Sequence, residues 1–462
     1  MEEKRNSFSG RIGFVLAAAG SAVGLGNLWR FPYLAAKDGG GVFLIVYLVL
    51  ALTFGFTLLV SEVAIGRNTR QSSLTAYGKV DQRFKGIGVF SALVPFLILP
   101  YYCIIGGWVL KYFVTFATGN GKEAAQEGYF GGFITQQYAP IVFDAIFLLA
   151  TAFVIFKGVD KGIEAISKIL MPILFILVVG ISIFSICISD PESGRTGLQG
   201  LKVYLIPNFS RMTIKSFFMV VMDAMGQLFY SISVAMGIMI TYGSYVKKGD
   251  NLMRSVNQIE IFDTVVAFLA GIMIIPAVYV FMGTEGMKGG PGLMFIAIPQ
   301  VFKAMGQAGQ VIGAVFFLMV LFAALTSSIS VMEAVVAGLM DKFKISRNRA
   351  TTIETVIALG IGIIICLGYN VLYFEAKLPN TPPDSNVQIL DIVDYIANNV
   401  LMPIVAIGTC ILIGWFVKPK FVIDEVTRNG EKFGRKGLYI VMVKVVAPIL
   451  LVLLLLGAFG IL

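Results

Sequence analysis

Oxygen-bearing side chains stand at several places inside long apolar stretches of this sequence. A carboxylate, Asp263, lies early in one stretch, and Thr326 and Ser327 lie side by side in another. Asn27 and Ser231 stand in two more. Oxygen ligands suit a small hard cation, and an ionisable group inside an apolar span marks a functional site by default. The competing interpretations are an interfacial helix end for Asp263 and hydroxyls that bond only the preceding helical turn.

Two of these stretches are interrupted by residues that weaken a helix. Glycines at 20, 24 and 26, with Ser21, fall in the string 19–32, and Ser233 and Gly237 fall in the string 226–237. Glycine lowers the cost of leaving helical geometry, although small residues also let helices pack closely, and both interpretations stay open. Unwound helices present free N–H groups to an anion and free carbonyls to a cation. Two breaks therefore predict a binding site between them.

Several classes of chemistry are disfavoured by composition. The chain has 0 His, and its 4 Cys (Cys103, Cys187, Cys366 and Cys410) show no paired spacing. Imidazole catalysis, zinc sites and a disulfide framework need those residues. No nucleophile stands beside a recognisable base, so we do not expect an enzyme or an organic cofactor.

Long apolar helices must position these residues. Of the 462 residues, 57% are hydrophobic and only 14% charged, which predicts an all-α polytopic membrane protein whose main solvent is the lipid bilayer. Hydropathy and Gly/Pro breaks predict about eleven spans: 11–36, 41–66, 87–117, 139–156, 166–189, 213–243, 254–282, 309–340, 351–370, 392–416 and 437–461. The Gly/Pro-broken apolar segment 289–302 predicts a short helix that does not span.

The basic residues that give the net charge of +9 are placed along the chain in a pattern that indicates membrane topology. Basic residues gather before the first span and in alternate loops, for example Arg11, Arg67, Lys157, Lys247 and Lys342. By the positive-inside rule these loops and the N-terminus are cytoplasmic, and an odd number of spans places the C-terminus outside. This pattern disfavours nucleic-acid binding and favours a multi-pass protein of the cell inner (plasma) membrane.

Three long strings closely resemble the neurotransmitter:sodium symporter family, in particular its bacterial amino-acid transporters. They are 20–32, 290–302 and Leu325-Thr326-Ser327-Ser328, and the resemblance runs from Arg5 to about the tenth helix. It implies two inverted five-helix repeats with interrupted first and sixth helices. The division would be 1–189 for the first repeat, 190–417 for the second, and 418–462 for a cytoplasmic loop and the eleventh helix.

The resemblance also implies two sodium sites, matched residue by residue. Sodium site one would use Ala22, Asn27, Ser231, Asp263 and the substrate carboxylate, and sodium site two would use Gly20, Val23, Ala323, Thr326 and Ser327. Both sets are oxygen ligands, in agreement with the residue chemistry noted above.

Substrate and gate residues follow from the same resemblance. The substrate would contact Ala22, Leu25, Gly26, Ile98, Tyr102, Tyr230, Ser231, Ser233, Met236, Ser327 and Val331. Arg30 and Asp394 would close the outside, and Arg5 and Asp341, with Ser244 and Tyr245 nearby, would close the inside. The implied function is sodium-coupled uptake of neutral hydrophobic or aromatic amino acids by alternating access.

The sequence departs from the family pattern in four respects. It has eleven predicted helices where about twelve are common, which leaves the oligomeric state open. Ala235 stands where Gly is common, so the extent of unwinding there is open too, and Phe8 stands where Trp is frequent. Asp263 supplies a carboxylate where animal members use chloride, which predicts chloride independence. A receptor or scaffold without flux, and an amine or osmolyte substrate, are the competing hypotheses.

Overall fold

The computed structural model describes residues 7–210, 212–288, 292–379 and 387–461. Its helices are α1 (Arg11–Ala22), α2 (Phe31–Lys37), α3 (Gly41–Leu50), α4 (Phe56–Thr69), α5 (Ser73–Val80), α6 (Lys85–Ala117), α7 (Gly121–Ala124), α8 (Tyr129–Ile134), α9 (Ala139–Phe156), α10 (Ala165–Cys187), α11 (Gly197–Leu205), α12 (Ile214–Ser231), α13 (Ile238–Tyr245), α14 (Leu252–Met282), α15 (Ile298–Ala304), α16 (Gln307–Phe343), α17 (Arg347–Leu367), α18 (Ile389–Asp394), α19 (Met402–Ile411), α20 (Lys420–Val426), α21 (Lys436–Val441) and α22 (Ala447–Ala458). Strands β1 (Ser189–Asp190) and β2 (Arg195–Thr196) pair antiparallel in one connecting loop. Short π-helical segments join many of these helices: η1 (Gly26–Arg30), η2 (Ala51–Gly55), η4 (Val159–Glu164), η6 (Leu293–Ala297), η7 (Tyr395–Leu401), η8 (Leu412–Phe416) and η9 (Met442–Val446).

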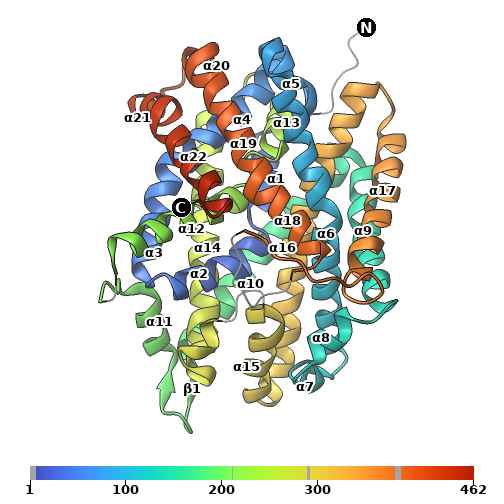
Figure 1. The fold of residues 1–462 in the computed structure, drawn as a ribbon, viewed down its shortest axis with the longest axis vertical. Helices are drawn as coiled ribbons and strands as arrows, with labels where there is room; N and C mark the ends of the chain where they lie inside the picture. The colour runs from blue at the N-terminus through green and yellow to red at the C-terminus, as the bar shows by residue number, and fades with distance from the viewer. Residues whose placement is uncertain (1–6, 211, 289–291, 380–386, 462) are drawn as a thin grey trace.

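The long helices run along one axis of the molecule. The helices α5 and α20 lie at one end, called here the N-terminal end, and α7, α15 and β1 lie at the opposite end (Figure 1). Within the described residues, nine helical stretches are long and apolar enough to cross a membrane, and α1 with the segment 26–37 makes a tenth. The pair α12 and α13 lies where the remaining expected span was placed, and α12 carries Lys215 and Asp223. The expected membrane architecture is thus confirmed.

Burial separates an inner from an outer set of helices. In the most apolar windows of α6, α14 and α16, 61% of residues are buried, against 28% in the stretch containing α10 and 22% in the stretch ending with α22. Large apolar side chains of the outer set are exposed, such as Phe153, Ile176 and Ile449. Such a surface suits lipid rather than water. The helix α1 packs against α14 and α16 of the inner set and also against α10.

The non-spanning helix expected near 289–302 is present as η6 and α15. Its residues 289–291 lie outside the described part of the chain. Phe295 of η6 is buried, and its carbonyl accepts a hydrogen bond of 2.8 Å from the Tyr112 hydroxyl of α6. Trp29 and Trp108 meet the Phe295 ring edge-on. This aromatic cluster holds the short helix against the bundle at the opposite end.

Candidate functional site

The first helix is broken where the glycines cluster. Regular α-helix ends at Ala22, and the segment that follows from Gly26 leaves at an angle of 51°. Across the break the Gly24 N–H donates to the Ala22 carbonyl at 3.0 Å, and the Asn27 N–H donates to the Gly24 carbonyl at 3.2 Å. Carbonyls near Ala22 therefore have geometry other than that of a continuous α-helix.

Two glycines in this break also allow close contact with neighbouring helices. A Cβ at Gly24 would lie 2.6 Å from the Ser327 hydroxyl oxygen, and a Cβ at Gly26 would lie 2.2 Å from Cδ1 of Tyr230. Both distances are far shorter than a van der Waals contact. Unwinding and close packing, which the sequence left as alternatives, occur in the same segment.

The second break lies between α12 and α13, from Ile232 to Gly237. Backbone φ is positive at every second residue, with 54° at Ser233, 61° at Ala235 and 71° at Gly237. The Ala235 N–H donates to Oε1 of the buried Glu62 at 2.6 Å. The segment is thus fully unwound even though Ala stands where the family commonly has Gly. Glu62 contributes by binding the freed backbone.

A buried polar cluster lies where the two breaks face α14. The Asn27 amide donates to Ser231 Oγ at 2.9 Å and to Asp263 Oδ1 at 2.8 Å, and Ser231 Oγ donates to the same Asp263 oxygen at 2.8 Å. All three residues are 0% exposed. Oδ1 of Asn27 has no hydrogen-bond partner within the described structure. A buried carboxylate beside an unsatisfied amide oxygen fits a small hard cation, which would satisfy both groups.

A second group of oxygens lies between α1 and α16. Ser327 Oγ donates to the Ser21 carbonyl at 3.0 Å and lies 3.3 Å from the Gly20 carbonyl, and Thr326 Oγ1 donates to the Ala323 carbonyl at 3.1 Å. A Cβ added to Gly20 would lie 3.3 Å from Cβ of Thr326. The structure therefore brings together four of the five residues expected at sodium site two, and the fifth, Val23, is buried at the end of α1.

A cavity lies between these two groups of oxygens. Its lining residues are Ser21, Ala22, Gly24, Gly26, Asn27, Ile98, Tyr102, Tyr230, Ser233, Met236, Ser327 and Val331. Nine of the eleven residues expected to contact substrate belong to it. Leu25 instead donates its N–H to the Tyr102 hydroxyl at 3.3 Å, and Ser231 belongs to the polar cluster. The sequence analysis did not assign Ser21 or Gly24 to the pocket, although both stand in the first interrupted string.

Arg30 of η1 and Asp394 of α18 form no ion pair within the described residues. Asp394 accepts a hydrogen bond of 2.6 Å from the Asn398 amide, which also donates to the Tyr101 hydroxyl at 3.1 Å. Arg30, Tyr230 and Asn398 line a second cavity, and Tyr230 also lines the first. The expected outer gate residues are therefore close to this cavity but not joined. Asn398 and Tyr101 were not expected from sequence.

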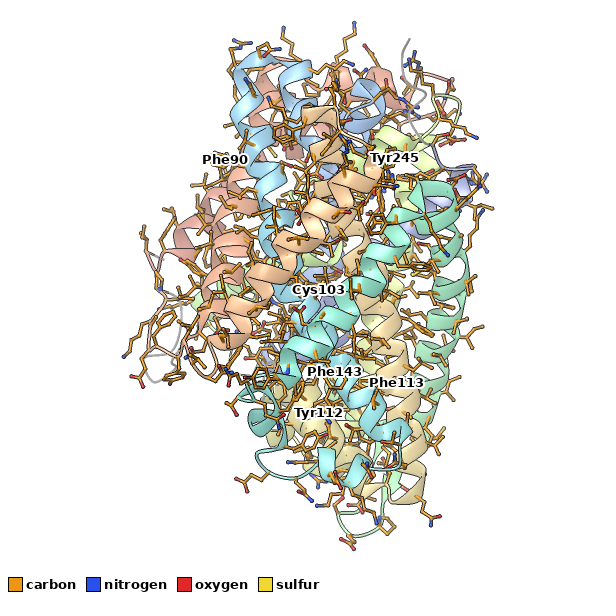
Figure 2. The ribbon with its side chains drawn as sticks, turned by 90° about the vertical axis from the view of Figure 1, so that its right-hand side faces the viewer. Phe90, Cys103, Tyr112, Phe113, Phe143 and Tyr245 are labelled. Atoms are coloured by element: carbon orange, nitrogen blue, oxygen red, sulfur yellow. The ribbon has the colours of Figure 1, made fainter. Side chains whose placement is uncertain are left out.

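At the N-terminal end, the gate residues are packed. The Ser244 hydroxyl donates to the Thr241 carbonyl at 2.5 Å, and the Tyr245 hydroxyl donates to Glu333 at 2.6 Å. Figure 2 shows Tyr245 near this end. Arg347, which sequence reasoning missed, binds the two Glu333 oxygens at 2.6 and 2.9 Å. Bonds between these helices close this end.

Two further gate expectations lie at the same end. Phe8, at the position often taken by Trp, is 1% exposed and meets the rings of Tyr242 and Tyr245 edge-on. Asp341 accepts the Ser72 N–H at 2.6 Å. Arg5, the expected partner of Asp341, lies outside the described residues.

A bundle closed at one end, with a central cavity between two discontinuous helices, defines the class of secondary transporters. The sequence model of the Sodium:neurotransmitter symporter family matches residues 5–122 and 137–460. The chain therefore belongs to this family, as its motifs predicted, and it is a sodium-dependent symporter rather than an enzyme.

Relatives extend over the whole chain. An uncharacterised sodium-dependent transporter of Bacillus subtilis, YhdH, is 33% identical over 471 aligned residues, which cover 100% of this chain and 99% of that protein. The sodium- and chloride-dependent GABA transporter 2 of Rattus norvegicus is 28% identical and covers 78% of this chain; the alignment spans 67% of that transporter. The crystal structure of MhsT in complex with L-phenylalanine superposes with a TM-score of 0.86 at 34% identity, over 98% of this chain and 100% of MhsT. The interrupted-helix fold expected from sequence is thus confirmed.

Proposed function

We propose that the protein takes up neutral hydrophobic or aromatic amino acids together with sodium, by alternating access and without a requirement for chloride. The observation that carries this proposal is the cavity between the two breaks. Within the described residues its lining has no acidic or basic side chain, and it lies beside the Asn27–Ser231–Asp263 cluster. A charged side chain on the substrate would have no counterion there.

Both ends of an amino acid have partners of suitable chemistry in this proposal. The backbone of the first break and the Tyr102 hydroxyl would bind the carboxylate, and carbonyls freed near Ala22 and Ser233 would bind the amino group. Ile98, Met236 and Val331 would contact the side chain. Because Met is flexible, Met236 could adapt to aromatic as well as aliphatic substrates. The L-phenylalanine in MhsT supports this choice by analogy.

Two sodium sites complete the proposal. Ala22, Asn27, Ser231 and Asp263 would hold one ion beside the substrate carboxylate, and Gly20, Val23, Ala323, Thr326 and Ser327 would hold the other. The ion at Asp263 would neutralise a carboxylate that has no basic partner within the described structure. Sodium would thereby favour the closed arrangement of both breaks and couple its gradient to substrate.

We infer the orientation from charge. Arg11, Arg67 and Lys247 lie at the N-terminal end, so that end would face the cytoplasm of a plasma-membrane protein and the C-terminus would lie outside. The repeats would span 1–189 and 190–417, with 418–462 appended. Joining Arg30 to Asp394 would close the outside before the N-terminal end opens.

The purified protein in liposomes tests the function directly. We expect an inward sodium gradient to drive accumulation of labelled L-phenylalanine, with competition by other neutral apolar amino acids. Equal uptake without the gradient would contradict sodium coupling, and competition by amines alone would contradict the substrate class. Saturable binding without flux would favour a receptor instead.

The chloride assignment depends on Asp263. We expect Asp263→Asn to lower uptake at least about tenfold in chloride-free buffer, because the site loses the charge that balances sodium. Chloride should restore part of that uptake in the variant and change nothing in the parent protein. Identical sodium and chloride dependence in both proteins would remove this role from Asp263.

A further inference from the structure

Two buried carboxyl groups lie outside the transport site, among α6, α9 and α17. Asp144 of α9 and Glu354 of α17 are each 1% exposed. None of their four carboxyl oxygens has a hydrogen-bond partner within the described structure. Asp263, in contrast, is bound by Asn27 and Ser231. Unpartnered buried acids of this kind need an explanation, since almost all buried polar groups in proteins are satisfied.

The carboxyl of Asp144 lies in a narrow gap between helices. A Cβ added to Gly362 of α17 would be 2.7 Å from its Oδ2, and a Cβ added to Gly107 of α6 would be 2.7 Å from its backbone nitrogen. Glycine at both positions makes room for Asp144 between α6 and α17. Glu354 precedes Gly362 by eight residues, or about two turns, on the same face of α17. The two acids are therefore stacked along one helix interface.

The thiol of Cys103 is within electrostatic reach of both acids, which places it beside this column. Figure 2 shows Cys103 near mid-height in the molecule and Phe143, the neighbour of Asp144, nearer the opposite end. Mid-height is the depth at which a charge is most costly. Insertion of an ionised Asp at the centre of a spanning helix costs roughly 2.5–3.5 kcal/mol even on the more permissive scales.

Groups facing the two acids from the surrounding helices supply no positive charge. Cys103 of α6 is near both acids, and Cys366 of α17 is near Asp144. On α16, the Ser328 hydroxyl bonds Thr151 of α9 at 2.8 Å. The basic residues of α6 and α17 are Lys85, Lys111, Arg347 and Arg349, of which Lys85 and Arg349 are exposed. Arg347 binds Glu333, and Lys111 of α6 lies 5.9 Å from the ring centre of Phe143.

The remaining neighbours of α9 are η4 and α8. The first carries Asp160 and Lys161, which are both exposed, and Glu164, which binds Lys168 at 2.6 Å. The second carries Tyr129, whose hydroxyl bonds Thr115 at 2.9 Å. Neither element offers a counterion to Asp144.

We propose that Asp144 and Glu354 are two proton-binding sites, whose bound protons hold α9 and α17 in the packing seen here and whose loss at alkaline pH inhibits transport. Each acid holds its own proton, because no hydrogen bond joins the two carboxyls. When a proton leaves, the bare carboxylate draws water into the interface and separates the helices. The bond between Thr151 and Ser328 carries that movement to α16, beside Thr326 and Ser327.

The direction of the pH effect separates these acids from Asp263. Protons compete with sodium at Asp263, so acid should weaken sodium binding there. Deprotonation of Asp144 and Glu354 should instead impair the protein as pH rises. An alkaline loss of stability and uptake therefore reports the proposed proton sites.

Infrared difference spectra of the protein in liposomes test whether the protons are bound. At neutral pH we expect the carbonyl stretch of protonated carboxylic acids, with one component missing in Asp144→Asn and another in Glu354→Gln. Glu127→Gln, in an exposed loop, is the matched control and should leave the band unchanged. A spectrum in which neither variant removes a component means that the groups are ionised, and overturns the proposal.

A pH series tests what the protons do. Between about pH 7 and about pH 10, where buried acids of this kind titrate, the parent protein should lose thermal stability and most of its sodium-driven L-phenylalanine uptake. The Asp144→Asn, Glu354→Gln double variant should lose neither. If parent and double variant decline alike, the protons are not the cause and the proposal fails. The infrared spectra and the thermal stability are measured without substrate. They therefore test the proposed proton sites even if the assignment of the substrate is wrong.

Discussion

At the scale of single residues, the glycines of the first break allow close contact with neighbouring helices as well as a non-helical backbone. Gly26 faces the Tyr230 ring so closely that even one methyl group has no space. Its carbonyl accepts a hydrogen bond of 3.0 Å from the buried Gln227 amide, which ties the break to α12. The position therefore joins the two interrupted helices at the edge of the cavity.

We expect Gly26→Ala to weaken substrate binding at least about tenfold, which corresponds to about 1.4 kcal/mol, because Tyr230 must move out of the cavity wall. Binding of labelled L-phenylalanine to the purified protein measures the effect. Gly180→Ala is the control, since a Cβ at that position of α10 has no neighbour within 4 Å. Equal affinities in all three proteins would contradict the role given to this contact.

Asp38 gives a residue-scale prediction about pH. Its side chain is 8% exposed between α2 and α3, and burial together with the nearby charge of Asp223 raises its pKa to about 7. The folded protein then binds a proton more tightly than the unfolded chain, whose Asp pKa is about 3.9. Stability from this group is therefore present at acidic pH and is lost as pH rises from about 4 to about 7.

We expect Asp38→Asn to remove that dependence. When melting temperatures are measured in detergent across this pH range, the melting temperature of the variant should rise relative to that of the parent protein as pH rises. Lys37 lies 4.0 Å from Asp38 and pairs with Asp223 at 2.6 Å, so it keeps an acidic partner in the variant. A constant difference between the two melting curves would show that Asp38 does not titrate there.

At the scale of elements, the two breaks are built by different means. Glycines and a π-helical segment interrupt the first helix, whereas the second relies on three residues of positive φ, only one of which is Gly. Left-handed backbone costs a non-glycine residue roughly 1–2 kcal/mol. The bond from the Ala235 N–H to Glu62 offsets part of that cost and holds the break against α4.

A pair of substitutions at Ala235 tests this view. Ala235→Gly should keep or improve thermal stability and keep uptake, because glycine accepts φ of 61° without strain. Ala235→Val should lose most uptake and melt several degrees lower, since a β-branched residue is strongly disfavoured in that conformation. A valine variant that behaves like the glycine variant would show that the break does not depend on this backbone geometry.

At the scale of the whole molecule, the two ends of the transport path differ. Bonds among Tyr245, Glu333 and Arg347 close the N-terminal end, while Arg30 and Asp394 stay unjoined beside the second cavity. Alternating access requires that these conditions reverse. The closing contacts must therefore be strong enough to favour one state and weak enough to release it.

Ser244 is a suitable reporter of this exchange because it is 0% exposed at the closed end. In a Cys187→Ser background, which removes an exposed native thiol, Ser244→Cys should react slowly with a membrane-permeant maleimide in sodium and faster without it. Adding Tyr245→Phe removes the bond to Glu333, which is worth about 1.5–3 kcal/mol, and should speed labelling in sodium about tenfold or more. If the labelling rate of Ser244→Cys changes neither with sodium nor with the Tyr245→Phe substitution, the result would argue against opening at this end.

Local chemistry and periodicity were enough to predict the membrane class, the spans and both interruptions, whereas the pocket residues came from the family resemblance. Apolar runs of about 20 residues, clustered glycines and intramembrane oxygens each have meaning within one segment. Motif resemblance added the pairing of Asn27 with Asp263, which stand 236 residues apart. Those parts of the molecule were decided by the sequence alone.

Contacts between distant helices decided the rest. Only the fold shows that Glu62 binds Ala235, that Arg347 pairs with Glu333, and that Asp144 has no partner at all within the described chain. In each case the same side chain could be satisfied, paired or bare, depending on which helix face lies opposite. Sequence determines which groups enter the membrane, and tertiary packing determines whether each one has a partner, because burial makes an unpaired group costly.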